Sequence, residues 1–357
     1  MLGPIVVVGL SILIISIYMQ PISGELTRLG GYLENHYGWN EPQEVYPKPL
    51  FMMADNLSQY DRYYDVVVLG DSFSDNQLNG WQNYFVARTG LSLISFSLIR
   101  YNVDDLLQFE SFKRWPPSFF IYQSVERNVV ERNRDCAELV NREGSSVAKP
   151  IAIAAKEVTT RYEGRGQNSS GGGHIIFDEA VNFVKKAAIR NILNINTTET
   201  RRLALSRDDL FSSRNSQDLL VYLDDFVKLD QTLADIEIAR CSLLNTQHKV
   251  EEGGTTRFVA LVFPDKSTAY ARYLVDERYA TMSKLHYLQN DPDLTIADTL
   301  SRFEEALNED VVDLYLPNDT HCGFKGYKLA TESVLDLMLA KGLVNEGSHK
   351  KRIGRGD

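Results

Sequence analysis

The stretch Val66–Ser74 reads VVVLGDSFS and decides the fold. Four consecutive apolar residues, three of them β-branched, are typical of a fully buried parallel strand. Gly70 then allows a tight turn, and Ser72 stands where a helix should begin. The stretch therefore predicts a hydroxyl group at the carboxyl end of a central strand, which is where open α/β sheets build their sites.

Several other runs share the character of this first strand, being short, mostly apolar and rich in Val, Ile, Phe or Tyr. The five expected strands are Tyr64–Leu69, Leu91–Phe96, Ser118–Gln123, Arg257–Phe263 and Val311–Leu316. Helical patterns lie between several of them, notably Gly80–Thr89 and Ile296–Asn308. This alternation predicts a three-layer α/β/α sandwich around a mostly parallel five-stranded sheet.

The interval between the third and fourth expected strands is too long for one crossover connection. We therefore expect an insertion at residues 130–255 with its own helices, at Asp178–Leu193 and Gln217–Gln247. Within it, Gly164–Gly173 has a composition typical of a mobile loop. The catalytic domain is expected to span 64–342, preceded by a neck at 21–63 and followed by a polar tail at 343–357.

The N-terminus is strongly apolar, and no charged side chain precedes Glu25. About 19 residues at roughly 1.5 Å each would reach about 28 Å, barely enough to cross a bilayer core as a helix. A cleaved signal peptide would need a basic start and a better cleavage site. We therefore expect residues 1–20 to form an uncleaved membrane anchor, with a cleaved signal or a buried N-terminal helix as the alternatives.

Charge and composition exclude several classes of function. The chain has 357 residues and a formal net charge of −10 at pH 7, which argues against nucleic acid as a partner. The three cysteines show no metal-ligand spacing, so we expect no metal site and either buried thiols or one disulfide. The glycine-rich stretch 164–173 lacks a phosphate-binding pattern, and no flavin or nucleotide motif appears, so we predict no bound cofactor.

A second motif follows the last expected strand, where Asp319 and His321 are separated by one residue. A serine hydroxyl is unreactive until a base removes its proton, and a histidine oriented by a carboxylate is the usual base. Of the six histidines, His321 alone has such a partner motif. The sequence thus predicts a triad in which Ser72 is the nucleophile, His321 the base and Asp319 the residue that orients the imidazole.

The blocks Gly70-Asp71-Ser72 and Asp319-Thr320-His321, in this order, resemble those of the SGNH hydrolase superfamily. The resemblance implies a flavodoxin-like SGNH fold and supports the three triad roles. Backbone N–H groups at the turn of Gly70 and Asp71 could also hold the substrate or its oxyanion. The usual second and third blocks, a Gly and a Gly-x-Asn-Asp, are replaced here by SFSLIR at 95–100 and SVERN at 124–128.

Three further stretches resemble the periplasmic alginate O-acetyltransferases: residues 24–39, the SVERN stretch at 124–128, and VFPDKSTAY at 262–270. In those enzymes the Asp-x-His pair precedes the serine, whereas here it follows, so this chain resembles a permuted relative or a separate branch. The resemblance implies transfer of acetyl groups to an exopolysaccharide on the periplasmic side of the bacterial inner membrane. It further implies that a membrane-bound O-acyltransferase relays the acetyl donor.

Side chains that follow the expected strands are candidates for binding. Arg100 and Arg127 could donate to the oxyanion, and Lys266 and Tyr270 could hold a sugar. Each has a structural alternative. The arginines could pair with acidic neighbours, namely Glu126, Asp104 or Asp105, while Lys266 could fix a loop through a salt bridge and Tyr270 could be a packed ring.

Two other functions remain compatible with these residues. A carbohydrate esterase would use the same triad with water as the acceptor, and the difference lies in how well the site excludes water. A membrane-tethered assembly subunit that binds polysaccharide would have an unused serine site. The expected anchor and the SVERN stretch favour transfer.

Overall fold

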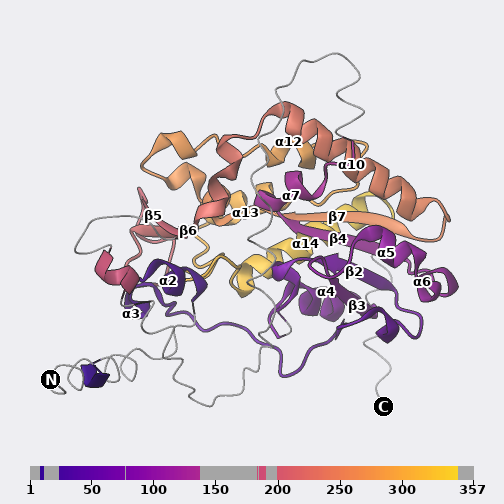
Figure 1. Ribbon diagram of the computed structural model, residues 1–357, viewed down its shortest axis with the longest axis horizontal. Coiled ribbons are helices and arrows are strands. Elements are labelled where there is room, and N and C mark those ends of the chain that lie inside the picture. Colours follow the sequence, from indigo (N-terminus) through magenta and orange to yellow (C-terminus); the bar gives the residue numbers. More distant parts are fainter. Residues whose placement is uncertain are drawn as a thin grey trace.

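A five-stranded sheet lies at the centre of the protein (Figure 1), whose computed structural model describes residues 9–11, 24–76, 78–136, 183, 185–189 and 199–344. Its strands are β1 (Met52–Met53), β2 (Val66–Gly70), β3 (Leu93–Ser97), β4 (Phe119–Val125) and β7 (Arg257–Phe263). They are arranged in the order β1-β3-β2-β4-β7, and every neighbouring pair is parallel. The predicted α/β class with a parallel sheet is confirmed, and the strand order reverses beside β2.

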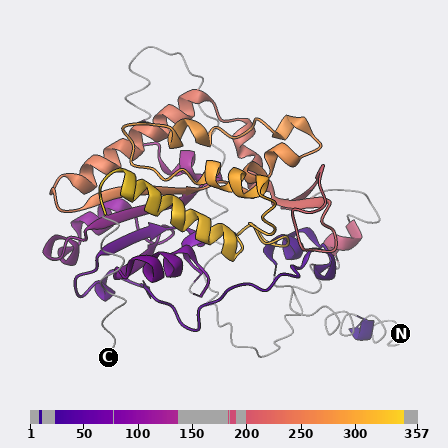
Figure 2. The same ribbon diagram turned by 180° about the vertical axis from the view of Figure 1, so that it is seen from behind.

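Alternate residues along the strands enter two separate cores. Val66 and Val68 face a core that contains side chains of three helices, α4 (Trp81–Thr89), α13 (Thr299–Asn308) and α14 (Phe324–Ala340). Figure 2 shows α14, in yellow, crossing in front of the sheet. Val67 and Leu69 face the opposite core. Its helices are α5 (Val103–Gln108), α6 (Glu110–Arg114), α7 (Glu126–Arg132), α10 (Leu233–Glu251) and α12 (Leu285–Gln289).

A smaller, antiparallel sheet is formed by β5 (Thr200–Ala204) and β6 (Asp218–Tyr222). Two short helices near the start of the chain, α2 (Glu25–Gly30) and α3 (Glu34–Tyr37), lie beside it at the left of Figure 1. Leu26 and Leu220 share a buried cluster, and the Thr200 hydroxyl donates to the Leu26 carbonyl at 2.9 Å. Residues predicted to be part of a neck are thus packed against the insertion.

Short 3-10 helices and one short α-helix lie in the connections between these elements. They are η1 (Leu57–Gln59), η2 (Ser72–Ser74), η4 (Leu223–Leu229), α11 (Lys266–Ala269), η5 (Ala271–Tyr273) and η6 (Glu277–Tyr279).

The fifth strand is not where we predicted it. Val311–Leu316 forms no strand, and Tyr315 makes only an isolated bridge with Cys322. Asp313 has a φ of 57°, and this left-handed conformation interrupts an extended run. The segment is apolar because Leu314 and Tyr315 are buried in the core, and the edge strand of the sheet is the two-residue β1 instead.

The long helix that we expected at Gln217–Gln247 is also wrong in its first half. Strand β6 and then η4 occupy residues up to Leu229, and α10 begins only at Leu233. The helix starts there because Thr232 and Asp235 form a capping box, in which each side chain accepts the other residue's backbone N–H. The apolar spacing that suggested one helix belongs to three different elements.

Several predictions fall mainly outside the described residues. Of Asp178–Leu193, only 183 and 185–189 are described, and they are helical. The glycine-rich stretch 164–173, most of residues 1–20 and the tail beyond 344 are not described. Among the described helices, none combines the length and apolar character that crossing a membrane requires.

A disulfide joins Cys136, just after α7, to Cys241 on α10, with 5.9 Å between the two Cα atoms. Cys322 is a free, buried thiol whose pKa is raised well above its ordinary value by burial. The sequence left open either buried thiols or one disulfide, and the structure has one disulfide and one free thiol. The bond ties the start of the insertion to the helix that leads into β7.

Candidate active site

Ser72 is the first residue of η2, and only Asp71 separates it from the carboxyl end of β2. The turn is fixed by Asp71, whose carboxylate accepts the backbone N–H of Phe73 at 3.1 Å. Because the strand order reverses beside β2, the carboxyl end of this strand opens at a switch point of the sheet, where α/β proteins bind ligands. The hydroxyl of Ser72 is therefore placed as the sequence predicted.

The three residues of the predicted triad lie in one hydrogen-bonded chain. The Ser72 Oγ is 3.0 Å from His321 Nε2, and His321 Nδ1 is 2.7 Å from Asp319 Oδ1. The same carboxylate oxygen accepts the backbone N–H of His321 at 3.0 Å. This arrangement can remove the serine proton and stabilise the imidazolium that results.

The electrostatics of the pair suit this role. Burial raises the pKa of Asp319, but the charge of His321 and the hydrogen bonds from it lower that pKa to about 2. Burial lowers the pKa of His321, but the negative charge of Asp319 outweighs it and leaves the pKa above its usual value. Asp319 thus stays ionised while the imidazole gains and loses its proton.

The pKa of His321 gives a direct test of this coupling. Catalysis needs the neutral imidazole, so turnover should rise with pH through a midpoint above about 6.5, the ordinary histidine value. Asp319→Asn removes the charge that raises the pKa, so the midpoint should fall. NMR titration of the His321 ring in both proteins measures this without requiring activity. A titration unchanged in Asp319→Asn would contradict the coupling.

Glu25, at the start of α2, belongs to the site although the sequence analysis missed it. Its backbone N–H donates to Asp319 Oδ2 at 3.1 Å, and burial followed by the charge of Asp319 raises its own pKa. Ligating atoms of Glu25, Asp319 and His321 lie within 4.8 Å of one another, a spacing that a metal ion could bridge. Asp319 and His321 already bond each other, and we assign no metal there.

Asp75 is a second acidic residue that the sequence analysis missed. It follows η2, and burial together with the negative charge of Asp71 raises its pKa to about 6. The charge of His321 acts on it in the opposite direction, which indicates that the two groups are close. Its position three residues after Ser72 was the signal that could have found it.

Asp71 has a structural role. Only 2% exposed, it accepts hydrogen bonds from Gln123 Nε2 at 2.9 Å, from the Val125 N–H at 2.8 Å and from Arg132 Nη1 at 2.5 Å. Burial raises the pKa of Asp71, but the charge of Arg132 and these hydrogen bonds outweigh burial, so the pKa lies below its usual value. The side chain thus ties the serine turn to β4 and α7, which corrects the expectation that it binds substrate.

Gly70 lets the serine turn lie close to β4. A Cβ at this position would collide with the Ser74 side chain and would stand 2.8 Å from the Gln123 Oε1. That amide oxygen already accepts the Ser74 hydroxyl at 2.6 Å, so neither neighbour can move without loss of the bond. Gly70 therefore shapes the turn.

The backbone N–H of Ser72 is a candidate donor to the oxyanion. It forms no hydrogen bond to any residue in the part of the chain that the structure describes. In acyl transfer the negative charge of the intermediate develops on the oxygen beside the nucleophile, where a free N–H stabilises it.

Arg127 is buried in a network of charges. Its Nη1 donates to Asp265 at 2.7 Å and to Asp225 at 3.3 Å, so it pairs with acids other than those we expected. Lys228 joins the network through Asp265 at 2.7 Å and Glu126 at 3.3 Å. The positive charge of Arg127 lowers the pKa of His321, so it acts on the site electrostatically, although its hydrogen bonds are to the two aspartates.

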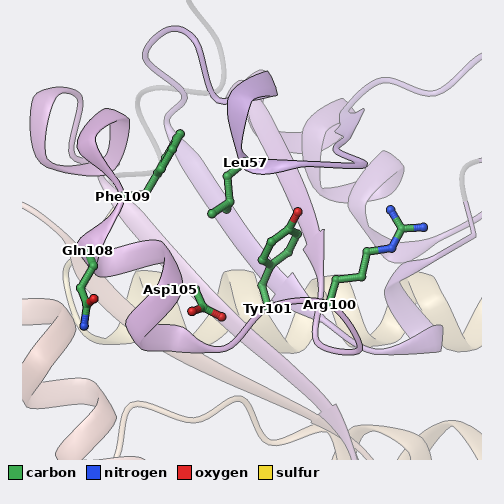
Figure 3. Close-up of a pocket in the computed structure, with 6 residues that line it drawn as sticks. All are labelled: Leu57, Arg100, Tyr101, Asp105, Gln108 and Phe109. Atoms are coloured by element: carbon green, nitrogen blue, oxygen red, sulfur yellow. The ribbon is translucent and has the colours of Figure 1, made fainter. Parts of the chain in front are cut away.

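Arg100 makes its contacts with Asp55, although its charge also lowers the pKa of Asp75. It is exposed, and its Nη1 donates to the Asp55 carbonyl at 2.9 Å and lies 3.5 Å from the Asp55 carboxylate. Figure 3 shows it at a pocket of about 420 Å³ beyond the carboxyl ends of β1 and β3. The lining residues are Leu57, Arg100, Tyr101, Asp105, Gln108 and Phe109. Arg100 thus pairs with Asp55 and with none of the three acidic residues that we expected.

Lys266 and Tyr270 are both fully buried, which corrects the prediction that they hold a sugar. The Tyr270 ring packs in the core, 4.8 Å from the Phe211 ring, which is the packed ring given above as the alternative to sugar binding. The Lys266 Nζ donates to three backbone carbonyls of the segment that carries Asp319. It fixes a loop, as its alternative proposed, but through carbonyl oxygens instead of a salt bridge.

Comparison with models of protein families, with curated proteins and with solved structures found no match to this chain. The interpretation of the site therefore depends on its own geometry and on the motifs quoted above.

Proposed function

We propose that this protein is an SGNH-type serine acyltransferase that moves an acetyl group through Ser72 onto a hydroxyl of an exopolysaccharide. The observation that carries the proposal is the hydrogen-bonded chain from Ser72 through His321 to Asp319 at the switch point of the sheet. We infer the acetyl group and the sugar acceptor from the short motifs that resemble those of SGNH proteins and of alginate O-acetyltransferases.

The reaction would proceed in two steps. The His321 Nε2 takes the proton of Ser72 as Oγ attacks the acetyl carbonyl, and the imidazolium then protonates the leaving group of the donor. In the second step a sugar hydroxyl attacks the acetyl-serine, and His321 takes the hydroxyl proton and returns it to Ser72. Asp319 accepts the hydrogen bond from Nδ1–H throughout, and the Ser72 N–H stabilises the oxyanion in both steps.

The disulfide supports a location outside the cytoplasm, because such bonds persist in oxidising compartments such as the periplasm. Together with the expected N-terminal anchor, it leads us to propose the periplasmic side of the inner membrane. There the donor would come from a membrane-bound O-acyltransferase, as the resemblance to the alginate enzymes implies.

Transfer and hydrolysis can be distinguished with the full-length chain, a chromogenic acetyl ester and a uronic-acid or glucan oligosaccharide. Acetate release and the mass of the sugar are followed together. We expect the sugar to gain one acetyl group with the wild type and with Ser301→Ala, which changes an exposed serine on α13, but not with Ser72→Ala.

Acetate release that depends on Ser72 without any gain in sugar mass would replace the transferase with an esterase. Neither product, from a protein shown to be folded, would favour the assembly subunit and would contradict an enzymatic role with these substrates.

A further inference from the structure

The segment Leu316–Cys322, called the catalytic loop below, carries Asp319 and His321 without regular secondary structure. Two hydrogen bonds close it internally, from the Leu316 N–H to the His321 carbonyl at 3.1 Å and from the Asp319 N–H to the Leu316 carbonyl at 3.2 Å. The geometry of the triad depends on this loop, so whatever fixes the loop also fixes the distance from His321 to Ser72.

The side chain of Lys266 contacts the catalytic loop from α11. Lys266 begins α11 directly beyond the carboxyl end of β7, and none of its surface is exposed. Its Nζ donates to the carbonyl oxygens of Leu316 at 2.8 Å, Pro317 at 2.9 Å and Asp319 at 3.1 Å. An ammonium group has three N–H donors, and all three are used on one turn of the chain.

A buried ammonium whose hydrogen bonds all go to neutral carbonyls costs free energy, because it is removed from water without a carboxylate partner. An apolar side chain would fill the same space without this cost. The burial of Lys228 is compensated differently, because its ammonium pairs with the carboxylates of Asp265 at 2.7 Å and Glu126 at 3.3 Å. No carboxylate of the described residues forms an ion pair with Lys266. The carbonyls of the catalytic loop are its hydrogen-bond acceptors, and the face of the Phe211 ring lies 5.2 Å from its Nζ.

We propose that Lys266 is a positioning residue, whose ammonium binds the carbonyls on both sides of the turn and thereby holds Asp319 and His321 in line with Ser72. The inference rests on the proposed function, because the alignment matters only if Ser72 is a nucleophile. Lys266 touches no reacting atom and acts through the loop.

The charge of Lys266 should then matter as much as its shape. A neutral amine has two N–H donors, so one of the three carbonyls would lose its partner. Burial lowers the pKa of Lys266 to about 7, although acidic groups around it favour the ammonium. These groups are Asp319 and Cys322 of the catalytic loop, Asp225 of η4, and Asp313 ahead of the loop. Reactivity should therefore fall again at alkaline pH.

The test is the rate at which a fluorophosphonate labels Ser72 in the full-length chain, from about pH 6 to about pH 10. This reagent needs the triad but no sugar and no physiological donor. We expect Lys266→Met to label about 100-fold more slowly, as for a misplacement of about 1 Å, and to lack the alkaline decline of the wild type. Lys249→Met, which removes an exposed ammonium of α10 that pairs with Asp104, should label close to the wild-type rate after correction for the folded fraction.

The downfield proton resonance of the His321–Asp319 hydrogen bond supplies a second readout. We expect it in the wild type and in Lys249→Met, and we expect it shifted or lost in Lys266→Met. Wild-type labelling and an unchanged resonance in Lys266→Met would overturn the proposal, as would equal losses in the two lysine variants.

If Lys266→Met does not fold, Lys266→Gln takes its place, because its amide has only two N–H donors for the three carbonyls. Wild-type labelling and an unchanged resonance in that variant overturn the proposal. If the wild type is not labelled at Ser72, the proposed function fails. The resonance then tests the positioning by itself, since it depends on the loop and not on the serine.

Discussion

Ser72→Ala should lower acetyl-ester turnover by about 10⁴-fold or more, and His321→Ala added to it should lower turnover no further. The two side chains act as one unit, because the hydroxyl attacks only when Nε2, 3.0 Å away, takes its proton. Once either is absent, the other has nothing left to contribute. Turnover of a chromogenic ester by both single variants and by the double variant completes the cycle.

The matched control is His248→Ala, which removes an exposed histidine of α10 and should leave turnover unchanged. Losses that multiply in the double variant would show that Ser72 and His321 act independently. Such a result would contradict the proposed mechanism, even if each single variant were slow.

Asp71→Ala should lower the free energy of unfolding by about 3–5 kcal/mol, the range expected when one partner of a buried ion pair is removed. Four donors would lose their acceptor, namely the N–H groups of Phe73 and Val125 and the side chains of Gln123 and Arg132. Urea denaturation followed by circular dichroism measures the change.

Two further variants sharpen this prediction. Asp61→Ala, at an exposed aspartate ahead of β2, should have little effect. Arg132→Met combined with Asp71→Ala should recover part of the loss, because the guanidinium is then no longer left without its acceptor. Equal stability of Asp71→Ala and the wild type would show that the serine turn does not depend on this carboxylate.

The central part of the fold was predictable because its signals are local. The run before Gly70 is apolar throughout and lies in the middle of the sheet, so β2 and its neighbours needed no tertiary context to be recognised. Ser72, Asp319 and His321 were found in the same way. The serine follows a strand, and the other two are separated by one residue, so each half of the site is visible in a short window.

The failures arose where local patterns were ambiguous. Val311–Leu316 is apolar because it is buried, and a buried irregular segment has the same composition as a buried strand. Strand β1 has two residues and therefore no periodicity to detect. The roles of Glu25 and Lys266 depend on contacts with Asp319 and its loop, which lie far from both in the sequence. Composition cannot reveal whether a lysine faces solvent or three carbonyls.

The contact between α2 and the triad sets where the chain can be shortened. The amide of Glu25 lies 3.1 Å from Asp319 Oδ2, on the side of the carboxylate away from His321. A recombinant form that started at Glu25 would replace this neutral amide with a charged terminal amine, which would compete with the imidazole for Asp319. Recombinant forms shortened at the N-terminus should therefore keep several residues ahead of Gly24, and a purification tag is better attached at the other end of the protein.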